Sequence, residues 1–131
     1  EINGGIRELD EIATQLEHLD SVMVGRAAYE NPVMFAAVDQ RFFGVETEHP
    51  CLAKTRRALI ESMFPYVETV LQSDAWLSRI TRPMHGLFSG MKGTRAWKRF
   101  MAENAYGPQA SLDTLKRAMD VVPAESLDAP I

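Results

Sequence analysis

The sequence VMVGRAAYENP, residues 22–32, decides how the first third of this chain folds. Its first three residues form a short apolar run that is typical of a buried strand, and a helical pattern begins at Ala27. Gly25 and Arg26 lie at the change from strand to helix. Such a turn suits a phosphate group, because glycine lets a ligand approach the backbone, the following amides point outward, and arginine adds a positive charge.

A second glycine turn, INGGI at residues 2–6, lies about twenty residues upstream. Apolar residues then recur at helical spacing over residues 6–19, with acidic residues between them, so we expect an amphipathic crossover helix. Single glycines after strands are common, and either turn alone is a weak indication of a ligand. Two such turns joined by one helix predict a βαβ unit, whose adjacent carboxyl-end loops can hold one phosphate between them.

The rest of the chain shows helical patterns and no strand. One pattern covers residues 31–43, with Asn31 as the expected cap and Pro32 as the first helical residue. A linker at residues 44–50 then marks the expected domain boundary. Four further helices are predicted, at residues 52–71 with a break near Phe64 caused by Pro65, at 75–88, at 94–105 and at 111–122 with Ser111 as the cap.

We therefore predict a mainly α chain in three parts. Residues 1–43 form the βα part, residues 50–122 form a four-helix bundle, and residues 123–131 form a flexible tail, because they hold two prolines and little periodicity. With 131 residues, of which 46% are apolar and 24% charged, the chain can bury an ordinary core. No apolar run approaches the roughly eighteen residues of a membrane span, and no signal peptide is visible.

The residue types exclude several kinds of chemistry. The single cysteine, Cys51, cannot form an internal disulfide, which indicates a reducing, cytoplasmic setting. His18, His49 and His85 do not have the spacing of metal ligands, so we predict no metal site. Cys51 follows His49 and Pro50 at an expected helix start, but a lone cysteine is more often structural than reactive.

Charge is distributed unevenly along the chain. The formal net charge is −4, yet residues 79–99 hold six basic residues and no acidic one, which leaves about −10 for the rest. This asymmetry is typical of a surface that binds phosphates, although an ordinary solvated helix face is the alternative. We call these residues the basic surface and predict that it binds RNA; they are Arg79, Arg82, Lys92, Arg95, Lys98 and Arg99.

Two other features of this segment bear on RNA binding. Aromatic residues are interleaved with the basic ones, at Trp76, Phe88, Trp97 and Phe100; they could stack on unpaired bases, but at helical spacing a place in the core is more common. The loop GLFSGMKG, residues 86–93, joins two basic helices. Its backbone amides and Lys92 could meet a phosphate together, and its three glycines favour that interpretation.

Three stretches together resemble a known family. They are INGGI, VMVGRAAYENP and RPMHGLFSGMKGTRAWKRF, and they resemble the carboxyl-terminal part of the flavin-dependent tRNA-dihydrouridine synthases, in particular the dihydrouridine synthase A subgroup. The resemblance runs from Glu1 to about Val122. It implies an FMN-binding TIM barrel followed by a helical domain, of which this chain keeps the last two βα units and the helical domain. The chain departs from the family's pattern at Pro83, His85 and Lys92, where histidine, leucine and proline are usual.

The resemblance also implies an activity, which is reduction of specific tRNA uridines to 5,6-dihydrouridine with FMN and NADPH. It assigns the FMN phosphate to Asn3, Gly4, Gly5, Gly25 and Arg26, and tRNA binding to the helical domain. The family's catalytic cysteine lies in the first half of the barrel, so we expect this chain alone to be inactive. Two alternatives stay open, a helical RNA-binding module without catalysis and another FMN-dependent barrel oxidoreductase. Open strand edges predict self-association, or disorder, near residues 1–24.

Overall fold

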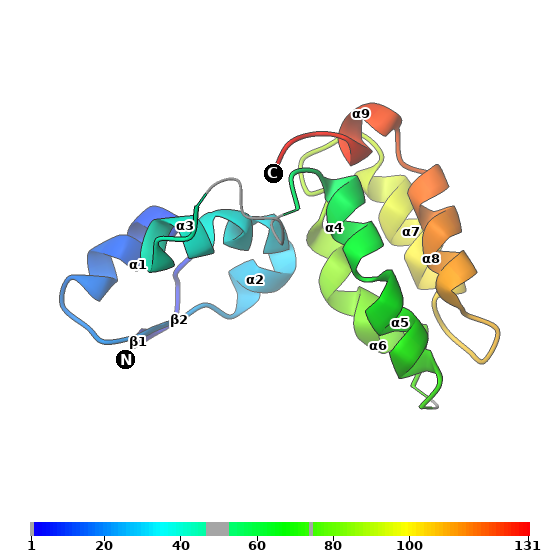
Figure 1. Cartoon of the computed structure of the whole chain (residues 1–131), viewed down its shortest axis with the longest axis horizontal. Helices are drawn as coiled ribbons and strands as arrows, with labels where there is room; N and C mark the ends of the chain where they lie inside the picture. The colour runs from blue at the N-terminus through cyan, green and yellow to red at the C-terminus, as the bar shows by residue number, and fades with distance from the viewer. Residues whose placement is uncertain (1, 47–52, 74) are drawn as a thin grey trace.

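The computed structural model describes residues 2–46, 53–73 and 75–131. These residues form a mainly helical chain with two visible parts (Figure 1). The first part holds the strands and helices α1 to α3, and the second holds α4 to α9. Most of the expected linker at residues 44–50 lies outside the described residues.

The first part contains the predicted βαβ unit. Strand β1 (Ile2–Asn3) pairs in parallel with β2 (Val22–Met23), with Ile2 opposite Val22. Helix α1 (Leu9–Leu16) forms the crossover between them. The Glu11 carboxylate accepts hydrogen bonds from the backbone N–H groups of Arg7 at 2.6 Å and Glu8 at 3.3 Å, which fixes where α1 begins. The prediction of two parallel strands joined by a helix is confirmed.

Two expectations for the first part were wrong. The strand at residues 22–24 was expected to be buried, but Met23 is 40% exposed. Within the described residues, no further strand pairs with β1 or β2. The expected helix at residues 31–43 is divided into the 3-10 helix η1 (Pro32–Ala37) and α3 (Val38–Phe43). Pro32 separates it from α2 (Arg26–Glu30), because proline cannot continue the hydrogen bonds of α2. Asn31 is the N-cap residue and Pro32 the first residue of the helical segment that follows, as expected, although the Asn31 side chain makes no capping hydrogen bond.

Helices in the second part lie where the sequence predicted them, and prolines divide two of them. Pro65 separates α4 (Arg56–Ser62) from α5 (Phe64–Leu71), as expected. The expected helix at 75–88 is wrong as a single element, because Pro83 divides it into α6 (Leu77–Thr81) and the 3-10 helix η2 (Arg82–Gly86). Helices α7 (Thr94–Asn104) and α8 (Leu112–Asp120) agree with the prediction, and Ser111 is the N-cap of α8.

The second part has one hydrophobic core. The rings of Phe88 and Trp97 lie edge to face at its centre, with centroids 5.1 Å apart. The indole N–H of Trp97 is also satisfied, because it donates to the carbonyl oxygen of Met84 at 3.1 Å. The fully buried apolar residues around this pair come from five helices and the segment after α7; they include Ile60, Val67, Leu77, Met101, Ala105, Leu115 and Ala118.

The expectation of a flexible tail at residues 123–131 was wrong. This segment forms α9 (Ala124–Leu127) and returns to the start of α4. Leu127 is 3% exposed and joins the core. The carboxylate of Asp128 pairs with Arg57, and the backbone N–H of Ile131 donates to the carbonyl oxygen of Lys54 at 3.3 Å. One buried leucine and these polar contacts hold a segment that has no periodic pattern.

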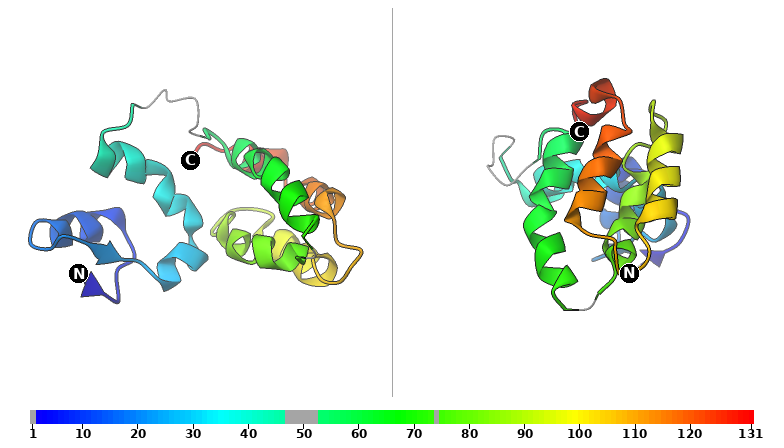
Figure 2. Two further views of the ribbon diagram at one scale, coloured as in Figure 1. Left: turned by 60° about the horizontal axis from the view of Figure 1, so that its bottom comes forward. Right: turned by 90° about the vertical axis from the view of Figure 1, so that its right-hand side faces the viewer.

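The two parts meet where η2 packs against α2 (Figure 2). A Cβ atom on Gly86 would lie 2.5 Å from the carbonyl oxygen of Tyr29, so only glycine allows this approach. The hydroxyl of Ser89 donates to the carbonyl oxygen of Glu30 at 2.7 Å. These contacts set the position of the two glycine turns of the first part relative to the helices that carry the basic surface.

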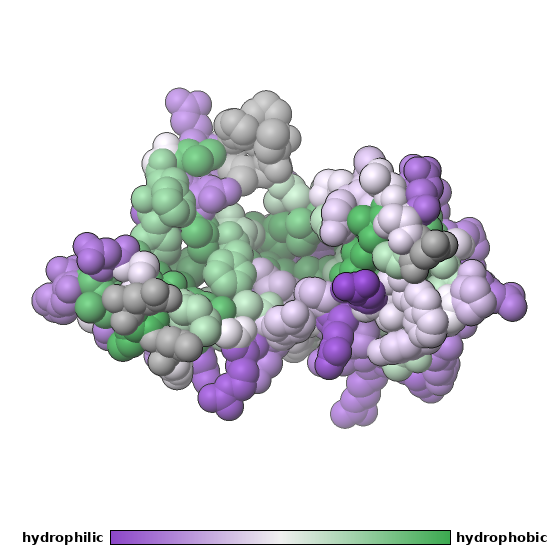
Figure 3. All heavy atoms as spheres, turned by 90° about the horizontal axis from the view of Figure 1, so that it is seen from below, coloured by the Kyte–Doolittle hydropathy of each residue, from purple (hydrophilic) through white to green (hydrophobic). Residues whose placement is uncertain are grey.

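The first part is less well covered than the second. Its surface shows broad apolar areas (Figure 3), and its exposed large apolar side chains include Leu16, Phe35 and Phe43, the last at 74% exposure. An apolar hollow of about 340 Å³ lies between α1, β2 and α3. Exposed apolar surface of this kind is typical of a region that packs against further protein.

Candidate functional site

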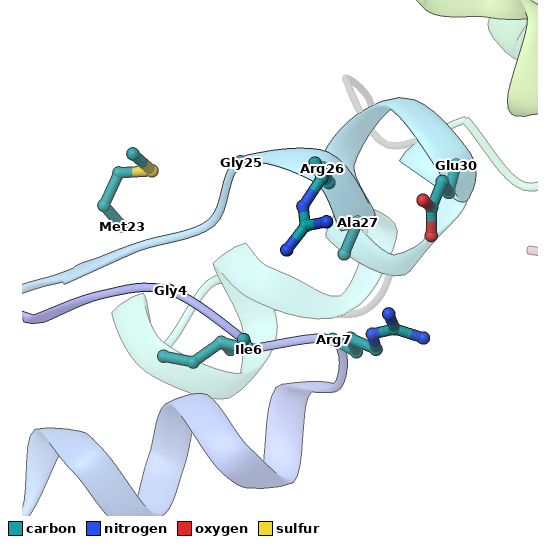
Figure 4. Close-up of a pocket in the computed structure, with 9 residues that line it drawn as sticks. Gly4, Ile6, Arg7, Met23, Gly25, Arg26, Ala27 and Glu30 are labelled. Carbon is teal, nitrogen blue, oxygen red and sulfur yellow. The ribbon is translucent and has the colours of Figure 1, made fainter.

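Both glycine turns border a single hollow of about 190 Å³ (Figure 4). Four of the five predicted phosphate-site residues, Gly4, Gly5, Gly25 and Arg26, line it. Asn3, the fifth, is the last residue of β1 and directly precedes Gly4. The parallel register of β1 and β2 causes this arrangement, because it places the carboxyl ends of the two strands side by side.

The glycines of the two turns differ in backbone conformation. Gly4 and Gly5 have φ angles of 130° and 72°, a region that residues with side chains rarely adopt. Gly25 has a φ of −96°, and a Cβ atom there would meet only the sulfur of Met23, at 3.7 Å. Crowding does not require glycine at residue 25, so the space beside it is open to a ligand.

Two arginines line the hollow. Arg26 is the first residue of α2, and its side chain extends from that helix toward the loop at Ile6 (Figure 4). Arg7 lines the same hollow, which the sequence interpretation missed. Its place directly after INGGI was the available indication. Glu30 also lines the hollow, so one carboxylate lies with two guanidinium groups, and the balance of charge favours an anion.

All six residues of the basic surface are exposed. Arg79 lies on α6, Arg82 begins η2, Lys92 lies in the following loop, and the other three lie on α7. Lys92 forms an ion pair with Glu125 of α9 at 3.0 Å, a partner that the sequence interpretation also missed. Within the described part of the chain, no carboxylate forms an ion pair with the other five.

The Trp97–Met84 hydrogen bond brings the cations of two elements together. It joins α7 to η2, so Lys98, next to Trp97, comes close to His85, next to Met84. His85 is half-buried, and this burial lowers the pKa of its imidazole below the ordinary value. The positive charges of Lys98 and Arg82 lower the pKa of His85 further.

The four aromatic residues of this segment have three different environments. Phe88 and Trp97 are fully buried, so their prediction as core residues is confirmed. Phe100 is partly buried, and the guanidinium of Arg117 lies 5.7 Å from its ring centroid. Trp76, the N-cap residue of α6, is 55% exposed and is the one of the four with an open ring face.

Glycines in the loop at 86–93 serve packing more than ligand binding. Gly86 allows contact with α2, as described above, and a Cβ on Gly93 would lie 2.6 Å from Cδ of Pro123. Gly90 has a φ of 77° and open space around it. An open hollow lies beside Arg95, at the start of α7, whose first turn has no acidic residue. The loop glycines therefore give weaker support for a ligand than the sequence interpretation gave them.

The remaining expectations concern metal sites, the other histidines, Cys51 and membrane spans. Residues 2–46, 53–73 and 75–131 contain no group of three or more His, Cys, Asp or Glu that could hold a metal ion. His18 is exposed, while His49 and Cys51 lie outside the described residues. Within the same ranges no helix has the length and apolar character needed to cross a membrane.

Comparisons with known proteins agree on one family. A family profile described as "Dihydrouridine synthase (Dus)" matches residues 1–122. A "tRNA-dihydrouridine(20/20a) synthase" of Vibrio vulnificus (strain CMCP6) is 43% identical over 124 residues, which cover 95% of this chain and 37% of that protein. Proteins with the same name in Shewanella oneidensis and Escherichia coli (strain K12) are 47% and 43% identical, over 92% of this chain and 35% and 34% of their own length. The chain thus spans about a third of the curated relatives it matches.

Proposed function

Because this chain belongs to the dihydrouridine synthase family, we propose that it is the carboxyl-terminal part of an enzyme that reduces uridines in tRNA to 5,6-dihydrouridine. The match over residues 1–122 carries this proposal. Two independent features support it, namely a cationic hollow at two glycine turns and an exposed basic surface on a separate helical part.

In this proposal the first part is the end of a TIM barrel. A β1–α1–β2 unit followed by α2 has the strand–helix order of such a barrel, and the strands have open edges that further strands would pair. The exposed apolar surface of this part supports the same interpretation. Without the rest of the barrel, we expect these edges to favour self-association of the isolated chain.

We propose that the hollow holds the phosphate of FMN. Positive φ at Gly4 and Gly5, open space at Gly25 and the guanidinium of Arg26 suit that group, with Asn3 beside them. About 190 Å³ is less than the 300 Å³ or more that a ligand of flavin size usually occupies, so other parts of the protein would surround the rings. FMN, reduced by NADPH, would supply the hydride to the uridine. These residues would anchor and orient it.

The helical part would bind the tRNA. All six residues of the basic surface are exposed, and phosphate groups of RNA are the anions that such a surface attracts. The catalytic residues would come from the rest of the longer protein. The sequence around Cys51, the single cysteine here, does not match the sequence around the family's catalytic cysteine. A soluble tRNA substrate also fits a cytoplasmic enzyme.

Substitutions in the longer protein that ends with this chain can test the two assignments separately. Arg26→Gln should lower the flavin content of the purified protein and leave tRNA affinity within about twofold. Arg79→Ala with Arg82→Ala should leave flavin content unchanged and weaken tRNA binding. If both variants changed both properties equally, or neither changed any, the division of roles would be wrong.

A further inference from the structure

Two residues of the basic surface, Arg82 and Lys98, form a cluster with the ionisable side chain of His85. Arg82 and His85 lie three residues apart on η2, and Lys98 lies on α7, which packs against η2, near enough for its positive charge to act on His85. The hydrogen bond from Trp97 to the carbonyl oxygen of Met84 holds the two elements in this relation, and both of those residues are buried. The cluster is therefore positioned by the core rather than by flexible surface contacts.

The like charges of Arg82 and Lys98 repel each other. No carboxylate in the described ranges forms an ion pair with either residue. The elements packed against η2 carry further charged or ionisable groups: α2 has Arg26, Tyr29 and Glu30, α6 has Arg79, and α7 has Arg95, Arg99 and Glu103, whereas η1 has none. The charges that act on His85 are those of Lys98 and Arg82, and both are positive. Such a cluster is most stable when an anion lies between its members.

We propose that Arg82, His85 and Lys98 together hold one phosphate group of bound RNA, and that His85 takes up a proton when the phosphate binds. The inference rests on the proposed tRNA-binding function and adds to it a specific phosphate position and a dependence on pH.

The direction of the pH dependence follows from the surroundings of His85. In the free protein its pKa lies below the ordinary value, because of burial, Lys98 and Arg82, so the imidazole is neutral near pH 7. A phosphate anion beside it favours the protonated form and raises the pKa in the complex. Binding therefore takes up a proton, and RNA affinity increases as the pH falls through the interval between the bound and free pKa values.

The first test measures tRNA affinity of the 131-residue chain from about pH 7.5 to about pH 5.5 at constant ionic strength. We expect affinity to increase about fivefold over this range, and His85→Gln to remove most of the increase. His18→Gln is the matched control, since His18 is exposed on the other part of the chain, and it should keep the full increase. An equal increase in His85→Gln would overturn the inference while leaving tRNA binding itself intact.

A second test does not depend on tRNA. The imidazole signals of His85 should titrate at higher pH when inorganic phosphate is added, and Lys98→Met should raise the pKa of His85 in the phosphate-free protein by removing a positive charge. Lys116→Met, on α8, is the control and should leave that pKa unchanged. If inorganic phosphate shifted the His85 titration but tRNA did not, the cluster would be a site for free phosphate and the inference would be wrong. If tRNA did not bind at all, the proposed function would fail separately.

Discussion

The indole N–H of Trp97 donates to the carbonyl oxygen of Met84 at 3.1 Å, and this bond joins α7 to η2. Five of the six residues of the basic surface lie on these two elements or in the loop between them. The core therefore determines how the cations of two helical segments face the solvent together.

Trp97→Phe should destabilise the chain by about 1–3 kcal/mol, because it removes the hydrogen bond between α7 and η2 and part of a fully buried ring. Chemical denaturation measures this difference. Trp76→Phe is the matched control; its ring is 55% exposed, and the stability change should stay within about 0.5 kcal/mol. Equal destabilisation by the two variants would contradict the description of the core.

Gly86, the last residue of η2, and Gly25, the N-cap residue of α2, should respond differently to alanine. Gly86→Ala should disturb the contact between the two parts, since its Cβ would lie 2.5 Å from the carbonyl oxygen of Tyr29. Gly25→Ala should leave stability within about 0.5 kcal/mol, because the nearest neighbour of the added Cβ atom would be 3.7 Å away. Thermal unfolding compares them, and in the longer protein Gly25→Ala should still reduce flavin content. Destabilisation by Gly25→Ala alone would reverse this assignment.

The ion pair between Asp128 and Arg57 should make the free energy of unfolding depend on pH. Its two bonds measure 2.5 Å and 3.1 Å, and the hydrogen bond from Arg57 lowers the pKa of the Asp128 carboxyl. A depressed carboxyl pKa adds stability above the unfolded-state value of about 3.9, and this contribution disappears as the pH falls through the lower folded-state value. Asp128→Asn should therefore be less stable than the unchanged chain near pH 6 and similar to it near pH 2. A difference that persisted in acid would point to a cause other than this charge.

The basic surface should determine how salt affects tRNA binding. Replacing Arg79 and Arg82, or Arg95 and Arg99, by alanine should reduce the slope of log affinity against log salt by about one for each tRNA phosphate that the variant no longer neutralises. Arg41→Ala is the control, because Arg41 lies on α3 and pairs with Asp10 at 2.5 Å. If the Arg41 variant reduced the slope as much as either pair, RNA binding would not be localised to this surface.

Local sequence patterns predicted the elements that depend on local chemistry. Parallel strands with a crossover helix, the break at Pro65 and the cap at Ser111 follow from periodicity, proline geometry and capping. The break at Pro83 was missed although the same rule applies, since a helical pattern continues on both sides of it.

Contacts between distant residues could not be predicted in the same way. The packing of residues 123–131 depends on one buried leucine and on partners in α4, about seventy residues earlier in the chain. Arg7 lines the hollow because parallel pairing of β1 and β2 places its turn beside Gly25. Lys92 pairs with Glu125, and the charge of Lys98 acts on His85, because the fold brings together residues that no local pattern connects.

The most direct test of the central claim is the dihydrouridine content of tRNA, measured by mass spectrometry in cells that lack the gene encoding this chain. We expect dihydrouridine to disappear from specific tRNA positions and to be restored by the longer protein, but not by residues 1–131 alone. Unchanged dihydrouridine at every position in cells that have no other dihydrouridine synthase would contradict the account.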